Sequence, residues 1–169
     1  DTAGPIAGPV DICEPATSVN YAIATLPHAL QYIWTLPPGF SISAGAGTQS
    51  IFVDISPSAS SGMIWVKGVN KCGDFGDSAY LFVNVHPRPV PLISGPNNTC
   101  AGPGNVYSTD VGMSNYQWSS SAGGVITSGG TFTDNTATIT WNAAGLQHVY
   151  LNYTFNGCDA LTPTVYDVT

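Results

Sequence analysis

The sequence predicts an all-β protein made of two tandem β-sandwich domains, and three observations lead to this prediction. Gly (19) and Pro (13) are abundant among the 169 residues while only 8% are charged, which suits turn-rich sheets better than helices. Short segments of alternating apolar and polar residues recur between Gly/Pro turns, as in half-buried strands. The pattern is written twice along the chain, which predicts two domains of the same kind.

The repeat is anchored by Gly8-Pro9-Val10-Asp11-Ile12-Cys13, which returns as Gly95-Pro96-Asn97-Asn98-Thr99-Cys100. Further matches follow collinearly, with short gaps at turns: Tyr21 with Tyr107, Tyr32-x-Trp34 with Tyr116-x-Trp118, Ile51-x-Val53-x-Ile55 with Ala137-x-Ile139-x-Trp141, Ile64-x-Val66 with Val149-x-Leu151, and Asn70-x-Cys72 with Asn156-x-Cys158. We therefore expect domains at 1–86 and 93–169, joined by a proline-rich linker at 87–92.

Each copy should contribute a set of short strands. In the first copy we expect them at 20–24, 30–36, 41–44, 51–55, 63–69 and 80–85. We expect Ile64 and Val66 to be the core pair of their strand, so Trp65 should face outward. The second copy repeats the pattern and ends in a strand at 164–169. Short strands separated by Gly/Pro turns predict one sandwich per copy.

The segments before and between the copies are alike. Residues 4–9 echo 91–96, so we expect a short edge strand at Ile6 and at Ile93, and a further module before this segment in the parent protein. Alternate prolines at 87, 89 and 91 restrict φ and favour extended chain, which predicts a semi-rigid joint.

Four cysteines lie two per copy at nearly equal separations. Of the three pairings that four cysteines allow, only Cys13–Cys72 with Cys100–Cys158 respects the repeat, and it is our prediction; the alternative is four buried free thiols. A disulfide closing so long a loop contributes roughly 4 kcal/mol. It also indicates an oxidising compartment, hence a secreted or cell-surface protein. Metal binding by these cysteines is not expected, because no Cys-x-x-Cys pair or His cluster accompanies them.

These motifs carry a family resemblance. A pattern Gly-Pro-x-x-x-Cys, then Tyr-x-Trp, then Asn-x-Cys resembles the PKD-like, immunoglobulin-like modules that recur in tandem in secreted or surface Bacteroidetes proteins. Both copies carry the pattern, although the acidic pair of the usual Trp-Asp-Phe-Gly-Asp-Gly signature is missing after Trp34 and Trp118. The resemblance implies an immunoglobulin-like fold and a non-catalytic module in a long extracellular protein.

Charge and histidine placement narrow the function further. The net charge is −7 with three basic residues, which argues against nucleic acid and anionic membranes as partners. No apolar run approaches the length of a membrane span. His28, His86 and His148 have no repeated partner, so we expect no catalytic residues and no enzymatic activity.

The sequence contains residues suited to two kinds of ligand site. The acids Asp74 and Asp77 lie close together in a Gly-containing loop that could hold calcium weakly, although solvated turn acids are the plainer interpretation, and no other cofactor is expected. Trp65 and, at the matching place, Tyr150 are candidate carbohydrate or partner contacts, because flat exposed aromatics stack on sugar rings. Packing on the sheet surface or contact between modules or subunits explains the same residues.

Assembly and modification complete the expectations. Neutral strand edges rich in Ser, Thr and Asn could accept a strand from a neighbouring copy, which would allow a filament. Asn97 and Asn152 fit the N-glycosylation pattern, and Thr2 and Ser78 lie in short patterns that resemble O-glycosylation signals. The leading hypothesis is a structural or adhesive extracellular module that binds other modules or copies of itself. The second is a carbohydrate-binding module attached to a secreted polysaccharide-degrading enzyme.

Overall fold

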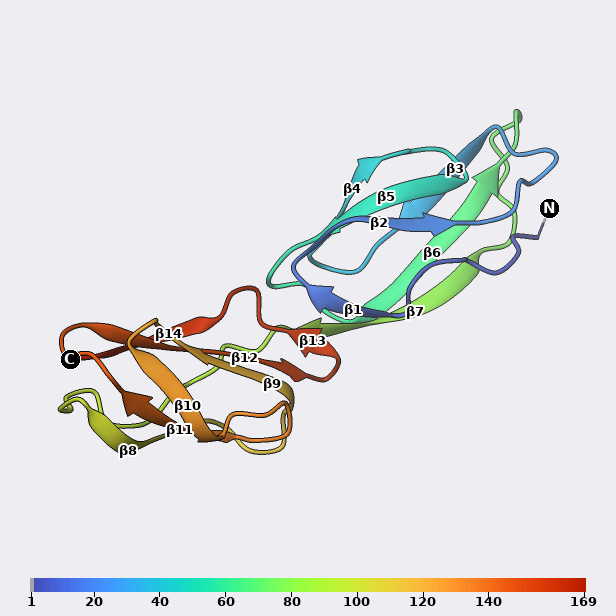
Figure 1. The fold of residues 1–169 in the computed structure, drawn as a ribbon. Helices are drawn as coiled ribbons and strands as arrows, with labels where there is room; N and C mark the ends of the chain where they lie inside the picture. Colours follow the sequence, from blue (N-terminus) through green and yellow to red (C-terminus); the bar gives the residue numbers. More distant parts are fainter. Residues whose placement is uncertain (1) are drawn as a thin grey trace. The chain divides into compact units, whose positions relative to one another are not determined.

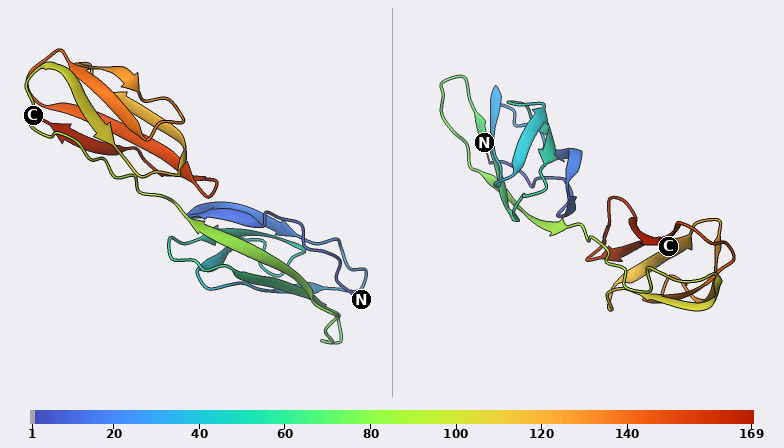
Figure 2. Two further views of the ribbon diagram at one scale, coloured as in Figure 1. Left: turned by 90° about the horizontal axis from the view of Figure 1, so that it is seen from below. Right: turned by 90° about the vertical axis from the view of Figure 1, so that its left-hand side faces the viewer.

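The computed structural model describes residues 2–169 and divides into two compact units, the first ending at Pro87 and the second beginning at Arg88 (Figure 1). The all-β prediction is confirmed, because the described residues form strands and no helix. It follows that nothing in residues 2–169 makes an apolar helix of membrane-spanning length. Each unit is an immunoglobulin-like sandwich of two sheets, whose layers can be followed in Figure 2.

In the first unit, one sheet has the strand order β1-β7-β6-β3 and the other has the order β2-β5-β4. The parallel pairing of β1 with β7 is the exception among antiparallel pairs. The strands are β1 (Asp11–Glu14), β2 (Ala16–Ala22), β3 (Gln31–Thr35), β4 (Phe40–Ala44), β5 (Ser50–Ile55), β6 (Gly62–Val69) and β7 (Ala79–Pro87).

In the second unit, one sheet has the order β10-β11-β8, and in the other β12 is flanked by β9 on one edge and by β13 and β14 on the other edge. The strands are β8 (Gly102–Ser108), β9 (Ser114–Ser120), β10 (Gly124–Gly129), β11 (Thr136–Trp141), β12 (Gln147–Phe155), β13 (Cys158–Asp159) and β14 (Thr164–Val168). Where the first unit has β1, the second has only the exchange of backbone hydrogen bonds between Thr169 and the segment 97–99.

Each unit encloses its own core, built from the inward side chains of both sheets. The predicted inward faces are confirmed: Ile64 and Val66 are fully buried, as are their equivalents Val149 and Leu151. Ile6 and Ile93 are buried as well, and each precedes a short bridge, Ala7 to Ala22 and Ser94 to Ser108, in place of a full edge strand.

The Gly-Pro pair that begins each repeat packs against the buried tyrosine of that repeat. The hydroxyl of Tyr21 donates to the carbonyl of Pro9, and that of Tyr107 to the carbonyl of Pro96, both at 3.1 Å. A Cβ atom on Gly95 would lie 2.4 Å from Cδ1 of Tyr107, closer than real Cβ atoms approach other atoms. Glycine is therefore required there by the tyrosine ring, and the equivalent glycine meets Tyr21 in the same way.

The Tyr-x-Trp motif joins each core to nearby loops. The indole nitrogen of Trp34 donates to the carbonyl of Thr48, and that of Trp118 to the carbonyl of Asp134, both at 2.9 Å. The acceptors lie in equivalent turns, between β4 and β5 and between β10 and β11. Trp118 is buried and Trp34 is half-buried, so the motif serves core packing and turn fixation in both units.

The predicted disulfides Cys13–Cys72 and Cys100–Cys158 are wrong. Cys72 and Cys100 are free and exposed, which also excludes four buried free thiols, whereas Cys13 and Cys158 are disulfide-bonded. The topology of the first unit explains the error. Cys13 pairs with His86 near the end of β7, whereas Cys72 follows β6 at the other end of the sheet, beyond Ala79. The stretch of β7 between these levels spans roughly 23 Å, and a disulfide needs Cα atoms within about 7 Å.

The second unit shows the same separation. Cys158 pairs with Phe155 at the end of β12. Cys100 follows Thr99, whose backbone amide donates to the carbonyl of Thr169. Thr169 directly follows β14, and the end of β14 pairs with the start of β12. The length of β12 between these ends is roughly 26 Å. In both units the two cysteines therefore lie at opposite ends of one sheet.

Candidate functional site

The most distinctive surface of the molecule is the outer side of the sheet β3-β6-β7 in the first unit. Side chains alternate along these strands, so the neighbours of the buried Ile64 and Val66 point to solvent. The outward set is large and apolar, and we call it the aromatic face: Ile33, Met63, Trp65, Tyr80 and Phe82. Trp65 therefore faces outward as its sequence position predicts, although its contribution to binding stays a prediction.

The aromatic face is held together by direct cross-strand pairs. Trp65 lies opposite Tyr80, and Met63 lies opposite Phe82. The rings of Trp65 and Tyr80 meet edge to face, with centroids 5.5 Å apart, yet 46% and 56% of these residues remain exposed. Such pairs order the side chains without covering them. The result is a fixed apolar surface of several adjoining side chains.

Polar and charged groups surround the aromatic face. On the same side of β6, the ammonium of Lys67 lies 3.9 Å from the ring centre of Phe75, a cation–π contact. Along β7 beyond Phe82, the Asn84 amide donates to Asp11 at 3.2 Å, and the His86 ring meets the same carboxylate oxygen at 3.1 Å. These hydrogen bonds, with that from His86 the larger cause, hold the pKa of Asp11 below its ordinary 3.8. An apolar centre with a polar rim is the usual anatomy of a contact surface.

The equivalent side of the second unit is polar. Tyr150 occupies the place of Trp65 but is only half-exposed, and it lies opposite Val165 in place of a second ring. The pair that corresponds to Met63 and Phe82 is His148 and Asp167, joined at 2.9 Å. The aromatic face is thus a property of one repeat, and Trp65 and Tyr150 do not form a matched pair of platforms.

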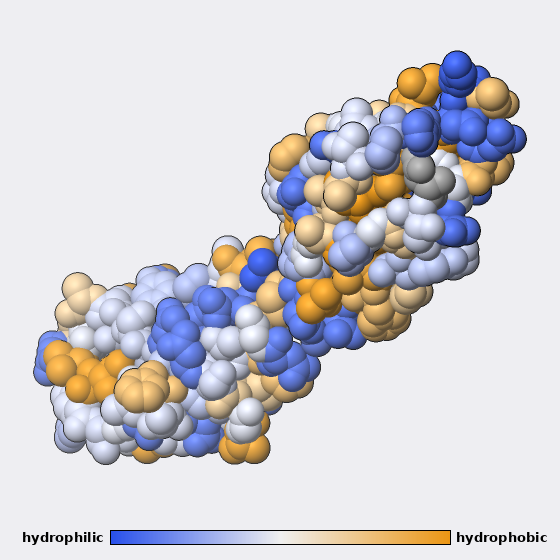
Figure 3. All heavy atoms as spheres, turned by 90° about the vertical axis from the view of Figure 1, so that its right-hand side faces the viewer, coloured by the Kyte–Doolittle hydropathy of each residue, from blue (hydrophilic) through white to orange (hydrophobic). Residues whose placement is uncertain are grey.

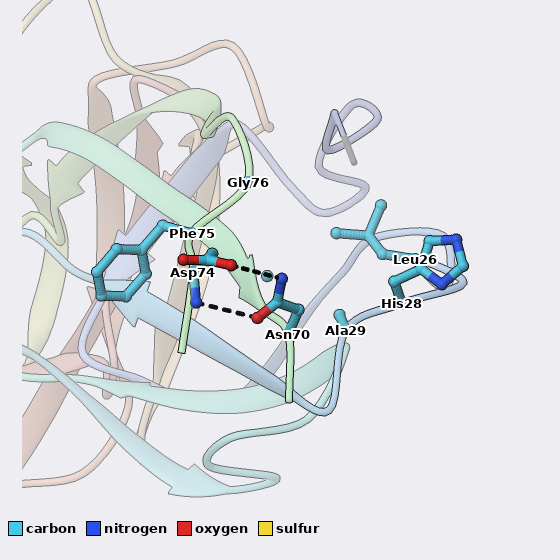
Figure 4. Close-up of a pocket in the computed structure, with 8 residues that line it drawn as sticks. Leu26, His28, Ala29, Asn70, Asp74, Phe75 and Gly76 are labelled. Atoms are coloured by element: carbon cyan, nitrogen blue, oxygen red, sulfur yellow. Dashed lines mark hydrogen bonds between the residues drawn. The ribbon is translucent and has the colours of Figure 1, made fainter. Parts of the chain in front are cut away.

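A loop network at one end of the first unit encloses a hollow of about 210 Å³ (Figure 4). Asn70 organises the network: its side-chain oxygen accepts from the amides of Cys72 at 2.8 Å and Asp74 at 3.0 Å, and its amide nitrogen donates to the Asp74 carboxylate at 3.2 Å. The asparagine of the Asn-x-Cys motif therefore fixes the loop that presents Cys72. His28 and Leu26 line the opposite side of the hollow.

A second hollow of about 380 Å³ adjoins the free thiol of Cys72. It shares His28 and Asn70 with the first hollow and is otherwise lined by Pro27, Leu30, Lys71 and Cys72. Leu30 is one of the most exposed large apolar residues of the chain. The thiol thus lies in a concave, partly apolar surface that carries one basic residue.

The second repeat builds its Asn-x-Cys segment differently. Asn156 and Gly157 both have positive φ, at 50° and 77°, in the tight turn between β12 and β13. Cys158 then enters β13 and is buried. The same motif therefore gives a buried, bonded cysteine in one repeat and an exposed free thiol in the other.

Within residues 2–169 the three histidines lie in separate surroundings. The His148 ring contacts Asp167, but the hydroxyl of Ser121 accepts from the backbone amide of His148 and does not meet its ring. His86 contacts Asp11 at the end of β7, and His28 lines the loop hollows. A serine nucleophile needs the imidazole itself as its base.

The candidate calcium ligands have separate partners. The Asp74 carboxylate accepts from Asn70, and that of Asp77 accepts from the hydroxyl of Thr2 at 3.1 Å. Over residues 2–169, no group of three or more His, Cys, Asp or Glu side chains is placed to hold a metal ion.

The candidate glycosylation residues differ in accessibility. Thr2 and Asn97 are exposed, Ser78 is half-buried, and Asn152 is half-buried with its side-chain amide donating to the carbonyl of Ala160 at 3.3 Å. Asp1, which precedes Thr2 in its pattern, lies outside the described residues.

Solved structures that resemble this chain share little sequence with it. The D00-D0 domain of intimin is 13% identical, with 98% of each chain covered and a TM-score of 0.48. The titin domains Z1Z2, solved in complex with telethonin, are 15% identical, with 99% of this chain and 94% of that chain covered and a TM-score of 0.37. A β-glucuronidase of Parabacteroides merdae is 9% identical, with 100% of this chain and 24% of that chain covered and a TM-score of 0.33. No curated protein sequence matches.

The sequence pattern of the PKD-like domain matches the chain twice in succession, over residues 1–83 and 86–168. These two matches cover nearly all of both units and agree with the repeat of the Gly-Pro, Tyr-x-Trp and Asn-x-Cys motifs. The chain therefore belongs to the PKD-like domain family and consists of two consecutive PKD-like domains.

Proposed function

We propose that this chain is a non-catalytic extracellular module of the structural or adhesive kind, and that the aromatic face is its contact surface for other modules. The PKD-like family is generally non-catalytic, and both the fold and the presence of a disulfide are typical of extracellular domains. The observation that carries the proposal is the clustering of Trp65, Tyr80 and Phe82, each about half exposed, on one sheet.

The physical reason is the cost of leaving such side chains in water. Burying apolar surface is worth about 25 cal/mol per Å², so a partner that covers two large aromatic rings gains several kcal/mol. Contiguous apolar patches with polar rims mark interaction sites on soluble domains. Figure 3 shows hydrophobic residues gathered in separate patches within the polar surface of the face it presents.

The partner we favour is a second copy of the same kind of module. The chain carries a net charge of −7, so copies repel one another at long range while the aromatic face attracts at contact. Added salt screens the repulsion and leaves apolar contact intact. Self-association that strengthens with salt is therefore the expected signature.

Sedimentation velocity over a range of protein and salt concentrations tests this proposal. The wild-type chain should associate more strongly as salt rises, and Trp65→Ala with Tyr80→Ala should abolish the association. The matched control is Val165→Ala, an exposed residue at the place of Tyr80 in the other repeat. Association that survives the double substitution, or a wild-type chain that stays monomeric at every salt concentration, would reject the aromatic face as a site of self-contact.

Carbohydrate binding is a second candidate function, favoured by the adjacent exposed rings of Trp65 and Tyr80. Sugar rings stack their C–H faces on such side chains. Affinity electrophoresis in gels containing soluble glycans would show retardation of the wild-type chain that is lost on Trp65→Ala. Equal mobility with and without each glycan tested would remove this candidate.

A further inference from the structure

The two free cysteines occupy positions that are bonded in the other repeat. By the register of the repeat, Cys72 corresponds to Cys158, and Cys100 corresponds to Cys13. Cys158 and Cys13 are disulfide-bonded, whereas Cys72 and Cys100 are free. Both cysteine positions of this module can therefore form a disulfide, and one cysteine at each position, Cys100 and Cys72, is free.

Neither free thiol can reach the other cysteine of its own repeat. The topology places the two cysteines of each unit at opposite ends of one sheet, roughly 23 Å or more apart along the strands. A disulfide requires Cα atoms within about 7 Å of each other. Each module is thus a body with one cysteine position at each end, and a bond at Cys72 or Cys100 needs a partner cysteine from elsewhere.

We infer that Cys72 and Cys100 are covalent joints, and that Cys72 of one copy forms a disulfide with Cys100 of a second copy. Each of these two positions is bonded in the other repeat, so the pair uses one position of each kind that is able to form a disulfide. Such a bond is heterologous, because each copy uses a different residue, so it can continue from copy to copy as a ring or a filament. The inference deepens the proposed function and rests on it in one respect, since exposed thiols stay reduced unless the protein reaches an oxidising compartment.

The surroundings of the two thiols suit this pairing. Cys72 lies in the hollow of about 380 Å³ that Pro27, Leu30 and Lys71 help to line. Cys100 lies in an exposed, uncharged segment, 97–101. This segment carries no charge that would be repelled by Lys71, the basic residue next to Cys72, in an otherwise acidic chain. The two joints therefore offer a partly apolar concave surface beside one thiol and an uncharged segment around the other.

The chemistry is thiol–disulfide exchange with a small disulfide, such as oxidised glutathione, as the oxidant. The thiolate of one cysteine attacks the glutathione disulfide and forms a mixed disulfide, releasing one reduced glutathione. The thiolate of the second cysteine attacks the protein sulfur of that mixed disulfide and releases a second reduced glutathione. Two protein thiols are oxidised to one disulfide, and one glutathione disulfide is reduced to two thiols.

The test incubates the purified, disulfide-containing chain in a buffer of reduced and oxidised glutathione and follows it by non-reducing electrophoresis. We expect a ladder of covalent oligomers, and mass spectrometry of a non-reduced digest should recover a Cys72–Cys100 peptide pair. The variants Cys72→Ser and Cys100→Ser should each remain monomeric. An equimolar mixture of the two variants should form dimers and nothing larger, because it holds one open joint of each kind.

Three results would overturn the inference. They are monomers that carry only glutathione, dimers of either single variant as abundant as wild-type oligomers, and cross-links that run only through Cys13 or Cys158. A Trp65→Ala and Tyr80→Ala chain should form the ladder as the wild type does. Loss of the aromatic face therefore tests the proposed contact surface, and loss of the cysteines tests the joints, independently of each other.

Discussion

The two repeats share their inward side chains and differ in their outward ones. Ile64 and Val66 in β6 correspond to Val149 and Leu151 in β12, and all four are fully buried. Between them, outward Trp65 corresponds to Tyr150. The cross-strand neighbours diverge further, since Tyr80 is replaced by Val165, and the pair of Met63 and Phe82 by the ion pair of His148 and Asp167.

This difference distinguishes the inward residues, which the fold requires, from the outward residues, which it does not require. A buried position is restricted by the volume and shape of its neighbours, so both repeats keep aliphatic residues there. A solvent-facing position on the same strand is free of that restriction. The apolar outward set in the first repeat is therefore not needed to fold a PKD-like sandwich, which is why we assign it to contact.

The largest expected effect concerns a feature that both repeats share, the packing of a glycine against the buried tyrosine. Gly95→Ala places a Cβ atom 2.4 Å from the ring of Tyr107, which cannot move within its packed core. We expect the second unit to lose about 3 kcal/mol of its free energy of unfolding, as in overpacked cores. Urea denaturation followed by tryptophan fluorescence measures this loss.

The control for this substitution is Gly4→Ala, because a Cβ on Gly4 meets nothing within 4 Å. It should leave stability within about 0.5 kcal/mol of the wild type. Equal stability of the Gly95→Ala and Gly4→Ala chains would mean that the Gly-Pro motif is not required by the tyrosine ring.

A smaller difference is expected between the two buried tyrosines. The hydroxyl of Tyr21 donates to the carbonyl of Pro9, whereas that of Tyr107 donates to Pro96 and also accepts from the indole nitrogen of buried Trp141 at 3.1 Å. Tyr107→Phe therefore leaves a buried donor without its partner and should cost about 2 kcal/mol, against about 1 kcal/mol for Tyr21→Phe. Each unfolding free energy comes from urea denaturation, and equal losses in the two repeats would contradict this account.

The repeated features of this fold could be predicted from the sequence, because they depend on local pattern. The alternation around Ile64 and Val66 placed Trp65 on the outside, and the matching of the two copies identified Tyr21 and Tyr107 as equivalent. The neighbours across the strands could not be assigned in the same way. The alternation within 80–85 predicts a strand, but the apposition of Tyr80 to Trp65 depends on a register that only the folded sheet fixes.

The disulfide prediction failed for a related reason. Equal cysteine separations in two copies show that the positions are equivalent, but they do not show at which end of a sheet each one lies. Cys13 lies at the end of β7 only because β1 pairs with β7 in parallel, and the sequence pattern predicts no strand at 11–14. The other sequence signal near these cysteines is the Asn-x-Cys motif, which takes a different conformation in each repeat. Its asparagine holds Cys72 in an exposed loop in the first repeat and begins a tight turn in the second.

Replacing an outward pair of the first repeat with the corresponding pair of the second tests what the aromatic face does. It shows whether that face serves contact with a partner or the stability of its own repeat. Met63→His with Phe82→Asp gives the first repeat the ion pair of the second, on an exposed surface where such pairs contribute little. We expect the free energy of unfolding to change by less than about 1 kcal/mol. Salt-strengthened self-association should be lost at the same time, as measured by sedimentation velocity. A large loss of stability would show that the aromatic face supports the fold of its own repeat.

The smallest expected effect distinguishes the two equivalent turns that receive the tryptophan indoles. In the second repeat the turn contains Asp134, whose carboxylate accepts from the hydroxyl of Thr131 at 2.6 Å and from its amide at 3.0 Å. These bonds, the hydroxyl first, lower the pKa of Asp134 from its ordinary 3.8. The first repeat has Thr48 as the equivalent acceptor of the indole and no carboxylate there.

A lowered pKa means that the charged carboxylate stabilises the turn above pH 3.8, and that this contribution is lost as pH falls through the folded-state pKa. We therefore expect the amide signals of 131–134 to shift in an acid titration followed by NMR, while those of 45–50 stay constant. Thr131→Ala should raise the pKa of Asp134 part of the way toward 3.8, because the backbone donor remains. Thr133→Ala serves as the control, because the hydroxyl of Thr133 meets that of Thr131 and not the carboxylate. An unchanged pKa in the Thr131 variant would mean that the hydroxyl does not distinguish the second turn from the first.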